Sequence, residues 1–282
     1  MGSLRSFGFH YVYDVYLLLK MTRVSVLMGI YNCAPTLPEA LDSLYAQTYQ
    51  DFKIILCDDG SKDNTYAVAK RYADKHDNIV LVRNEKNMGL NYTLNHCLEY
   101  ADTEYCARMD GDDISLPTRF EEEIKFLDEH PEYAIVTTPM KHFDENGIYR
   151  ENRGGGEPKL TSFPKASPFC HAPCMVRTEA YKAVGGYTVA EKLLREEDYH
   201  LWIKMYVAGY RGYTLEEPLY MMRDDRNAAR RRTFKARKNE AYVKHLAVKM
   251  LKLPFYYNIY CLIPLIKGIM PNWLYYLLYK LK

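Results

Sequence analysis

Val24–Ile30 reads Val-Ser-Val-Leu-Met-Gly-Ile, and this stretch decides how the following residues fold. A nearly continuous apolar run suits a β-strand that is covered on both faces, as the strands of parallel sheets are. Similar short runs alternate with helical patterns as far as Met109. That alternation predicts an α/β fold with a mostly parallel central sheet flanked by helices.

The expected elements follow from this alternation. Further strands are expected at Lys53–Cys57, Ile79–Val82, Tyr105–Met109 and Tyr133–Phe143. Helices are expected at Pro38–Gln47, 64–75, Leu90–Tyr100, Pro117–His130 and Glu197–Ala208. The carboxyl ends of the parallel strands should meet at one edge of the sheet, which is where open α/β sheets bind their ligands.

Aspartates follow two of these strands at the point where each strand ends. Asp58 and Asp59 follow the second strand, and Asp110, Asp112 and Asp113 follow the fourth. Three carboxylates within four positions repel one another unless a cation lies among them, so this cluster predicts a divalent-metal site. A solvated acidic turn that caps the next helix is the alternative explanation of the cluster.

Three other features can carry chemistry. Asp58 and Asp59 can accept hydrogen bonds from a ligand, or they can form an Asx turn that caps a helix. Glu197 and Asp198 open a helix, where acidic residues ordinarily compensate the helix dipole but can also serve as a general base. For His171, a structural role is favoured over contact with a ligand. The chain has neither a Gly-x-Gly-x-x-Gly nor a Walker lysine loop, so it lacks the usual phosphate cradles for hydride transfer and ATP hydrolysis.

Six motifs, in order along the chain, resemble those of the family 2 glycosyltransferases, which have the GT-A fold. They are Val24–Asn32, Gln47–Tyr49, Asp58–Ser61 with Asp63 and Thr65, Asn87–Leu90 with Asn95, Asp110–Asp113 and Glu197–Tyr199. The resemblance covers about Val24–Met222. One departure is His171-Ala-Pro-Cys, where many relatives have His-Pro followed by Ser or Thr, and it leaves the role of His171 open.

The resemblance implies roles for residues at both ends of the expected site. Tyr31 and Asp59 would contact the nucleotide base, with Asp58 beside them. Asp198 matches the catalytic base of the family, supported by Glu197. As a general base, Asp198 would take the proton from an acceptor hydroxyl that attacks the anomeric carbon from the opposite face. The expected outcome is inversion at that carbon.

The acidic cluster has an implied role as well. Asp110 and Asp112 match the Asp-x-Asp motif, which binds the sugar nucleotide and Mn²⁺ or Mg²⁺, with Asp113 alongside. A metal there would stabilise the departing diphosphate as a Lewis acid. The resemblance therefore implies a metal-dependent, inverting transferase. It would move a sugar from a nucleoside diphosphate, by family habit a UDP-sugar, to a hydroxyl of a glycan or lipid-linked acceptor in bacterial cell-surface polysaccharide biosynthesis.

Two other functions remain as alternatives. A sugar-nucleotide pyrophosphorylase would need a glycine-rich loop bearing Arg or Lys after the first strand, and residues 30–35 offer none. A non-catalytic, membrane-bound sugar-binding protein is the second alternative, and it would show no hydrolysis of a sugar nucleotide.

The charge of the chain is unevenly distributed. The whole sequence has 38 Lys and Arg against 36 Asp and Glu, a net charge of +2. Arg223–Lys282 holds 14 basic and 3 acidic residues, net +11, so residues 1–222 hold 24 basic and 33 acidic residues, net −9. A basic segment rich in Tyr, Leu and Ile predicts a helical tail that associates with an anionic membrane surface. A helix docked on the acidic body is the alternative, and nucleic acid is not expected as a partner.

These patterns suggest how the chain is divided. We expect an extension at 1–20, a catalytic domain at 21–222 and a basic, aromatic tail at 223–282. Within the catalytic domain, 21–115 would bind the nucleotide and 116–222 the acceptor. No uncharged apolar run reaches the roughly 18 residues that a membrane-spanning helix needs. The seven cysteines are odd in number and lie mostly in apolar runs, which favours reduced thiols. The expected location is therefore cytoplasmic, at the inner face of the cell membrane.

Overall fold

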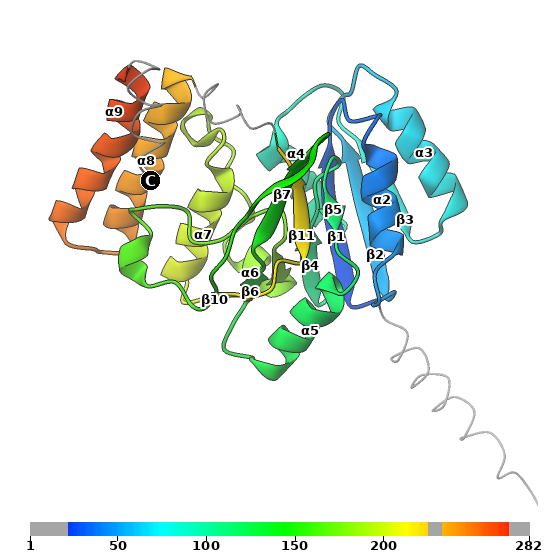
Figure 1. Ribbon diagram of the computed structural model, residues 1–282, viewed down its shortest axis with the longest axis horizontal. Coiled ribbons are helices and arrows are strands. Elements are labelled where there is room, and N and C mark those ends of the chain that lie inside the picture. Colours follow the sequence, from blue (N-terminus) through cyan, green and yellow to red (C-terminus); the bar gives the residue numbers. More distant parts are fainter. Residues whose placement is uncertain (1–21, 225–232, 271–282) are drawn as a thin grey trace, which may run out of the picture.

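The computed structural model describes residues 22–224 and 233–270, and the expected extension at 1–20 lies outside them. A seven-stranded sheet forms the centre of the molecule (Figure 1), in the order β10-β6-β9-β4-β1-β2-β3. Its strands are β1 (Val24–Ile30), β2 (Phe52–Asp58), β3 (Ile79–Arg83), β4 (Tyr105–Arg108), β6 (Ile135–Thr137), β9 (Met175–Arg177) and β10 (Gly212–Thr214). Strands β1 to β4 pair in parallel, and β9 runs antiparallel to both β4 and β6. The expected mostly parallel α/β sheet is confirmed.

Helices cover both faces of this sheet. One face carries α2 (Leu37–Tyr45), α3 (Thr65–Lys75) and α5 (Arg119–Glu129), and its core includes Met28, Leu41 and Phe120. The other face carries α4 (Leu90–Leu98), α6 (Thr178–Ala183), α7 (Glu197–Val207) and α8 (Phe234–Met250), packed around Leu27 and Trp202. Alternate residues of β1 enter opposite cores, because successive side chains of a strand point to opposite faces. This explains why the Val24–Ile30 run is almost wholly apolar.

A second, four-stranded sheet lies beside the carboxyl end of β4. Its order is β5-β11-β7-β8, with β5 (Ile114–Ser115), β11 (Tyr220–Arg223), β7 (Met140–Asp144) and β8 (Gly147–Glu151). The single strand expected at Tyr133–Phe143 is therefore wrong, because β6 and β7 belong to different sheets. Thr138 and Pro139 lie between them, and proline has no N–H to donate to a ladder, so the strand breaks where Pro139 stands.

The C-terminal residues form a helical hairpin on the flank opposite α3 (Figure 1). Thr233 caps α8 by accepting a hydrogen bond from Ala236 N at 3.2 Å, and Val243 and Ala247 of α8 are fully buried against the body. The chain then turns back through the 3₁₀ helix η4 (Phe255–Cys261) into α9 (Leu262–Ile269), which lies against α8. Among the described residues, no helix is both long and apolar enough to cross a membrane. All seven cysteines are free thiols.

Candidate active site

The loops after β1 and β2 are joined to each other at the carboxyl edge of the sheet. Tyr31 is the first residue after β1 and is 40 % exposed, so its ring is accessible to a ligand. Asn32 follows with φ = 48°, a left-handed conformation that Asn tolerates better than most residues. Its N–H donates to Ser61 Oγ at 3.0 Å, and its Oδ1 accepts from Lys62 N at 2.9 Å. These bonds hold Tyr31 at a fixed position above the sheet.

The two aspartates that follow β2 are both turned into the protein. Asp58 is fully buried, accepts a hydrogen bond from Ser61 N at 3.2 Å and pairs with Arg83 Nε at 2.9 Å. Asp59 is 4 % exposed and accepts from Asn84 Nδ2 at 2.8 Å, Met88 N at 2.8 Å and Gly89 N at 2.9 Å. Asp58 thus fixes the start of the loop that follows β2. Asp59 fixes the loop before α4, with its oxygens already engaged.

The acidic cluster divides into three differently placed carboxylates. Asp112 as a whole is exposed, but neighbouring atoms keep part of the water away from its carboxylate. This desolvation, and then the charge of Asp110, raise the pKa of Asp112. Asp110 is partly exposed, with its Oδ1 paired to Arg108. Asp113 is 2 % exposed, and its Oδ1 accepts a hydrogen bond from Arg223 N at 2.8 Å. Burial, followed by the charges of Asp110 and Asp112, raises the pKa of Asp113 to about 8. Only Asp110 and Asp112 therefore face the open side of the sheet edge.

Arg108, the last residue of β4, was not singled out in the sequence, although a charged residue inside an apolar strand is itself a signal. Its guanidinium is 1 % exposed, and its Nη2 lies 2.5 Å from Asp110 Oδ1. Its Nε and Nη1 are buried without a hydrogen-bond acceptor. A buried cation is retained where a nearby anion compensates its lost hydration. Arg108 thus places a permanent positive charge beneath the acidic cluster.

Two residues of β11 fix the acidic loop from the other side. The Tyr220 hydroxyl accepts a hydrogen bond from Asp110 N at 3.2 Å. Arg223 Nε donates to Asp112 O at 2.9 Å, and its guanidinium also pairs with Glu39 of α2. These contacts join α2, the acidic loop and β11 although they are far apart in sequence. No local pattern could have indicated them.

The start of α7 carries the expected catalytic pair. Glu197 is 9 % exposed, burial raises its pKa, and its Oε2 has no hydrogen-bond partner. Asp198 is partly exposed. Burial, and then the charge of Asp198, raise the pKa of the Cys170 thiol to about 11. Of the two carboxylates, Asp198 is the one within reach of solvent and a substrate.

His171 packs against Trp202 of α7, with 6.0 Å between the ring centroids. Its Nε2 is 2.8 Å from the Tyr187 hydroxyl, which is 3.2 Å from the Tyr181 hydroxyl. Burial, and then the Arg108 cation, hold the pKa of His171 well below its usual range, so the ring is neutral. Burial raises the pKa of Tyr187 well above its usual range, and the charges of Arg108 and Asp198 also act on it. Tyr187 therefore links the His171 ring to the Tyr181 hydroxyl of α6.

Helix α8 supports the loop that leads into α7. Asn239 of α8 is 7 % exposed, and its Nδ2 donates to both Glu191 O and Leu194 O, each at 3.2 Å. Arg195 follows with φ = 70°, a left-handed conformation that costs a non-glycine residue roughly 1–2 kcal/mol. Such strain persists only where the surroundings fix it. The position of Asp198 therefore depends on a helix within the segment expected to be a separate tail.

The residues at the sheet edge fit a divalent cation. No three His, Cys, Asp or Glu side chains of the described ranges are arranged to hold a metal ion by themselves. Asp110 and Asp112 nevertheless present carboxylate oxygens. Desolvation, and then the charge of Asp110, raise the pKa of Asp112, and a bound dication would favour its charged form. Protein cages for Mg²⁺ commonly supply one or two carboxylates, with waters and substrate phosphates completing the shell. A metal held jointly by Asp110, Asp112 and a ligand matches this donor set.

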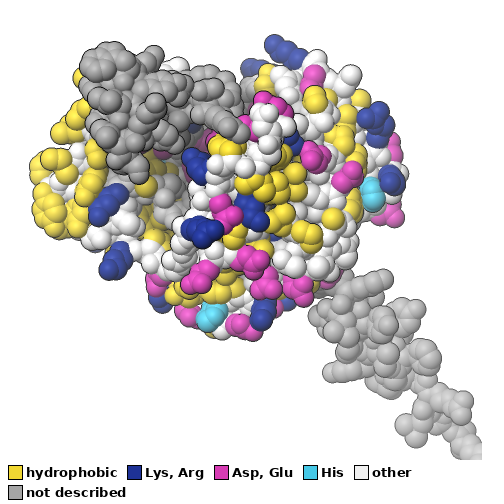
Figure 2. Space-filling view, viewed as in Figure 1, with side chains coloured by type: hydrophobic (Ala, Val, Ile, Leu, Met, Phe, Trp, Pro, Cys, Tyr) yellow, Lys and Arg dark blue, Asp and Glu magenta, His cyan; other side chains and the backbone are white. Residues whose placement is uncertain are grey.

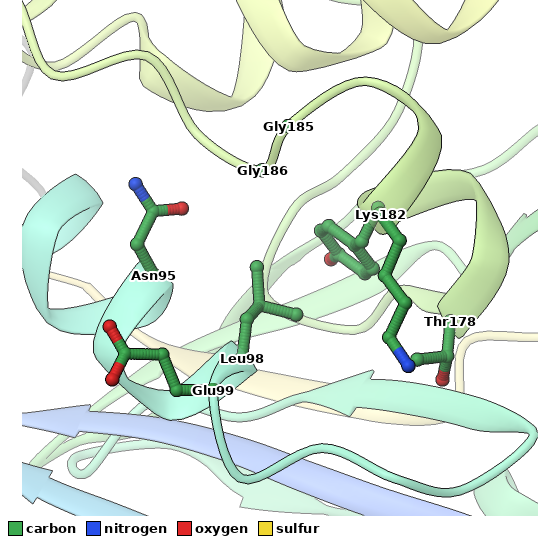
Figure 3. A pocket seen from close by; sticks show the side chains of 8 residues that line it. Asn95, Leu98, Glu99, Thr178, Lys182, Gly185 and Gly186 are labelled. Carbon is green, nitrogen blue, oxygen red and sulfur yellow. The ribbon is translucent and has the colours of Figure 1, made fainter.

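A pocket of about 250 Å³ between α4 and α6 lies away from these residues (Figure 3). Asn95 lines it, and the figure shows its amide on the side of Gly186. Asn95 Nδ2 donates to Tyr187 O at 2.8 Å and Asn95 Oδ1 accepts from Tyr187 N at 2.7 Å. Asn95 thus fixes the segment that carries Tyr187, which gives this residue of the fourth motif a structural role.

The sequence of the chain is similar to those of known glycosyltransferases. The family description "Glycosyl transferase family 2" matches residues 25–185. EpsE of Bacillus subtilis (strain 168), named as a glycosyltransferase, is 42 % identical over 250 residues, covering 88 % of this chain and 90 % of EpsE. The amylovoran biosynthesis glycosyltransferase AmsE of Erwinia amylovora is 34 % identical, covering 71 % of this chain and 75 % of AmsE. WfaP of Escherichia coli, a β-1,3-glucosyltransferase named for UDP-Glc and α-D-GlcNAc-diphosphoundecaprenol, is 25 % identical over 68 % of this chain and 73 % of its own length.

Solved structures show the same fold. TarS 1–349 from S. aureus, in complex with UDP-GlcNAc, superposes with a TM-score of 0.67 and 21 % identity over 88 % of this chain and 71 % of TarS 1–349. The mannosyltransferase PcManGT from Pyrobaculum calidifontis, in complex with GDP-Man and Mn²⁺, gives a TM-score of 0.65 and 20 % identity over 92 % of this chain and 76 % of its own. Together with the sheet described above, they confirm the GT-A architecture expected from the motifs.

Proposed function

The chain belongs to glycosyl transferase family 2, and from this premise we propose that it is an inverting, metal-dependent glycosyltransferase of cell-surface polysaccharide biosynthesis. Its donor is a sugar nucleotide. The observation that carries the proposal is the arrangement of partly exposed carboxylates, with Asp110 and Asp112 beside the edge of β4 and Asp198 at the start of α7. The family makes a pyrophosphorylase or a non-catalytic sugar-binding protein the weaker explanation of these residues.

The donor side of the site would bind the sugar nucleotide and a cation. Tyr31 offers an exposed ring for the base, and Asp59 sets the loop beside it. Asp110 and Asp112 would hold Mn²⁺ or Mg²⁺, which when bound supplies Lewis-acid stabilisation of the leaving diphosphate. Asp58 and Asp113, both buried, would support this region from within, through Arg83 and Arg223. PcManGT was solved with GDP-Man and Mn²⁺, and that supports a metal here.

The acceptor side would prepare the attacking hydroxyl. Asp198 accepts the proton of this hydroxyl as the oxygen attacks the anomeric carbon from the face opposite the diphosphate, which inverts the configuration. Glu197, buried beside it with a raised pKa, holds the first turn of α7 rather than competing for that proton. Neutral His171, hydrogen-bonded to Tyr187, would have a structural role here.

The acceptor is proposed to be a glycan or lipid-linked sugar at the cytoplasmic face of the cell membrane. WfaP is named for an undecaprenol-linked acceptor, and this supports a lipid-linked substrate. The net charge of +11 in Arg223–Lys282 supports attraction to anionic lipid. The base is proposed to be uracil, because TarS was solved with UDP-GlcNAc and WfaP is named for UDP-Glc.

A panel of UDP-, GDP- and dTDP-sugars, with and without Mn²⁺, identifies the donor by thermal stabilisation. A ligand that binds only the folded protein raises its unfolding temperature. We expect a rise with one nucleotide that depends on Mn²⁺. Absence of stabilisation by every member of the panel would contradict the assignment of a sugar-nucleotide donor.

Two substitutions then separate the roles of the carboxylates. Asp112→Ala should lose the Mn²⁺-dependent part of nucleotide binding, measured by calorimetry. Asp198→Asn should keep that binding and lose transfer of label from the donor to a lipid extract. An Asp198→Asn protein with near-normal turnover would reject the general-base role.

A further inference from the structure

The part of the C-terminal segment that faces away from the body is an apolar ridge formed by η4 and α9. Its exposed side chains are Phe255, Tyr256, Ile259, Leu262, Ile263, Ile266 and Ile269. Phe255 is 83 % exposed and Ile269 is 74 % exposed, which is unusual for side chains of this size. Figure 2 shows hydrophobic side chains gathered on this flank of the molecule, with Lys or Arg side chains beside them.

In α9 the apolar residues Leu262, Ile266 and Ile269 recur at intervals of four and three positions, which puts them on one helical face. Phe255 and Ile259 belong to the 3₁₀ helix η4, which contacts α9, and their exposed side chains extend this apolar surface. The opposite face of α9 is used for packing. Pro264 is buried there, and a Cβ on Gly268 would lie 2.6 Å from the Phe234 ring of α8. The hairpin is therefore fixed by one face of α9, and the other face is left without a partner in the described residues.

Helix α8 has a different role from the ridge. Its apolar residues Val243, Ala247 and Val248 are buried against the body, and Asn239 supports the loop before α7. Of its basic residues, Arg237 and Lys244 are also buried, with Lys244 Nζ donating to Lys165 O at 2.5 Å. The sequence suggested that all of residues 223–282 contact the membrane. The packing of α8 limits this proposed contact, among the described residues, to η4 and α9.

The charged residues of the chain between the middle of α8 and the end of α9 have one sign. No Asp or Glu occurs from Ala241 to Met270. Exposed lysines lie at the end of α8, in the turn before η4 and on α9, at Lys249, Lys252 and Lys267. Lys165 of the body adds its ammonium group 5.7 Å from the Tyr260 ring. Tyr and Phe with apolar bodies beside lysines are the composition of helices that lie in the interface of an anionic bilayer.

We propose that the η4–α9 ridge is a docking surface that inserts into an anionic lipid bilayer, with the surrounding lysines contacting the headgroups. The proposal rests on the proposed function only in placing the enzyme at a membrane. A second copy of the chain fits less well, since a two-fold contact between ridges would bring the lysines of one copy against those of the other. The other candidate to cover the ridge is the segment 271–282 of the same chain, and a truncated chain tests it.

The experiment uses the full chain and flotation with vesicles of phosphatidylcholine alone or mixed with phosphatidylglycerol. Phe255→Asp combined with Ile259→Asp should reduce binding to the mixed vesicles at least about tenfold, because two inserted apolar side chains become anions. The matched control is Ile148→Asp combined with Val207→Asp, which changes two exposed apolar residues elsewhere, 55 % and 52 % exposed. Thermal unfolding of each variant checks that the fold is kept.

Several results would overturn the proposal. They are equal flotation of the ridge variant and wild type, equal binding to neutral and anionic vesicles, or a wild-type dimer in light scattering that the ridge variant converts to monomers. A full chain that does not bind the mixed vesicles, beside a chain ending at Met270 that does, would show that residues 271–282 occupy the ridge instead. The proposed function is tested separately, because Asp198→Asn should float like wild type. A wild-type chain that transfers sugar to a soluble acceptor but does not float with anionic vesicles would contradict only the docking surface.

Discussion

Arg108 Nη2 lies 2.5 Å from Asp110 Oδ1 at the carboxyl end of β4, and the guanidinium is buried while the carboxylate is about one-third exposed. This ion pair sets the charge of the acidic cluster from beneath. Asp110, Asp112 and Asp113 are three neighbouring acids, and in the described residues Arg223 binds the Oδ1 of Asp113 and the carbonyl of Asp112 but neither of the other two carboxylates of the cluster. A fixed cation at Asp110 limits their mutual repulsion and orients the one carboxylate that both the protein and a bound metal would use.

Arg108→Met should therefore weaken binding of a nucleotide with Mn²⁺ about tenfold, with little change in the unfolding free energy. Binding falls because Asp110 loses the partner that orients it. Stability changes little because the substitution removes a buried charge that has two unpaired N–H groups, and Asp110 can be hydrated instead. Calorimetric titration with UDP and Mn²⁺, paired with urea unfolding, separates the two effects. Unchanged affinity would show that Arg108 is a structural residue only.

Gly111 is required by a close approach within the acidic loop. A Cβ at this position would lie 2.8 Å from Cys33 Sγ and 3.1 Å from Ile30 Cγ2, so Gly111→Ala should destabilise the protein by about 1–3 kcal/mol. Adding Cys33→Ala removes the nearer atom and should restore part of that loss. Urea unfolding of both single variants and the double variant gives the coupling between the sites. Additive effects in this cycle would refute the steric explanation.

Asn239→Ala should lower kcat about 10- to 100-fold while leaving the KM for the donor nearly unchanged. The amide of Asn239 holds two carbonyls of the loop before α7, so its loss displaces Asp198 but does not reach the donor side of the site. Steady-state kinetics with the donor found in the screen measure this split. His245→Ala, an exposed change on the same helix, is the control. A higher donor KM with an unchanged kcat would contradict the positioning role.

The sequence indicated those parts of the site that depend on neighbours along the chain. Apolar runs that end in Asp58-Asp59 or Asp110-Gly111-Asp112-Asp113 mark the carboxyl edge of a parallel sheet, and the acidic start of α7 is a local feature too. Which carboxylate points outward is decided by tertiary partners. Arg223 lies 110 residues from Asp113 in the sequence, and its backbone N–H donates to the buried Asp113 Oδ1.

The way the chain divides into parts also depends on tertiary packing that local sequence does not reveal. Composition separated a basic segment at residue 223 from the acidic body. Packing divides that segment again, because α8 has apolar residues that complete the core beside α7, whereas α9 has none that reach the body's core. Both helices are basic and rich in apolar residues, so their average composition does not distinguish a buried face from an exposed one. Pro139, by contrast, was a local signal for the break between β6 and β7.

The buried imidazole of His200 on α7 should make stability depend on pH. Burial, and then the charge of Lys204, lower the pKa of His200 from 6.5 to about 4, and its Nδ1 has no hydrogen-bond partner. The folded protein therefore binds this proton more weakly than the unfolded chain. The stabilisation that the neutral ring contributes is fully present above pH 6.5 and is lost as the pH falls toward 4.

His200→Gln should consequently lose less stability than wild type between pH 6.5 and pH 4, with a difference of about 1 kcal/mol or more. Urea unfolding at several pH values in this window measures the two slopes. Comparing slopes rather than absolute stabilities removes the cost of the substitution itself, which is the same at each pH. His245→Gln, exposed on α8, should keep the wild-type slope. Parallel slopes for His200→Gln and wild type would mean that His200 is protonated in the folded state at the same pH as in the unfolded chain.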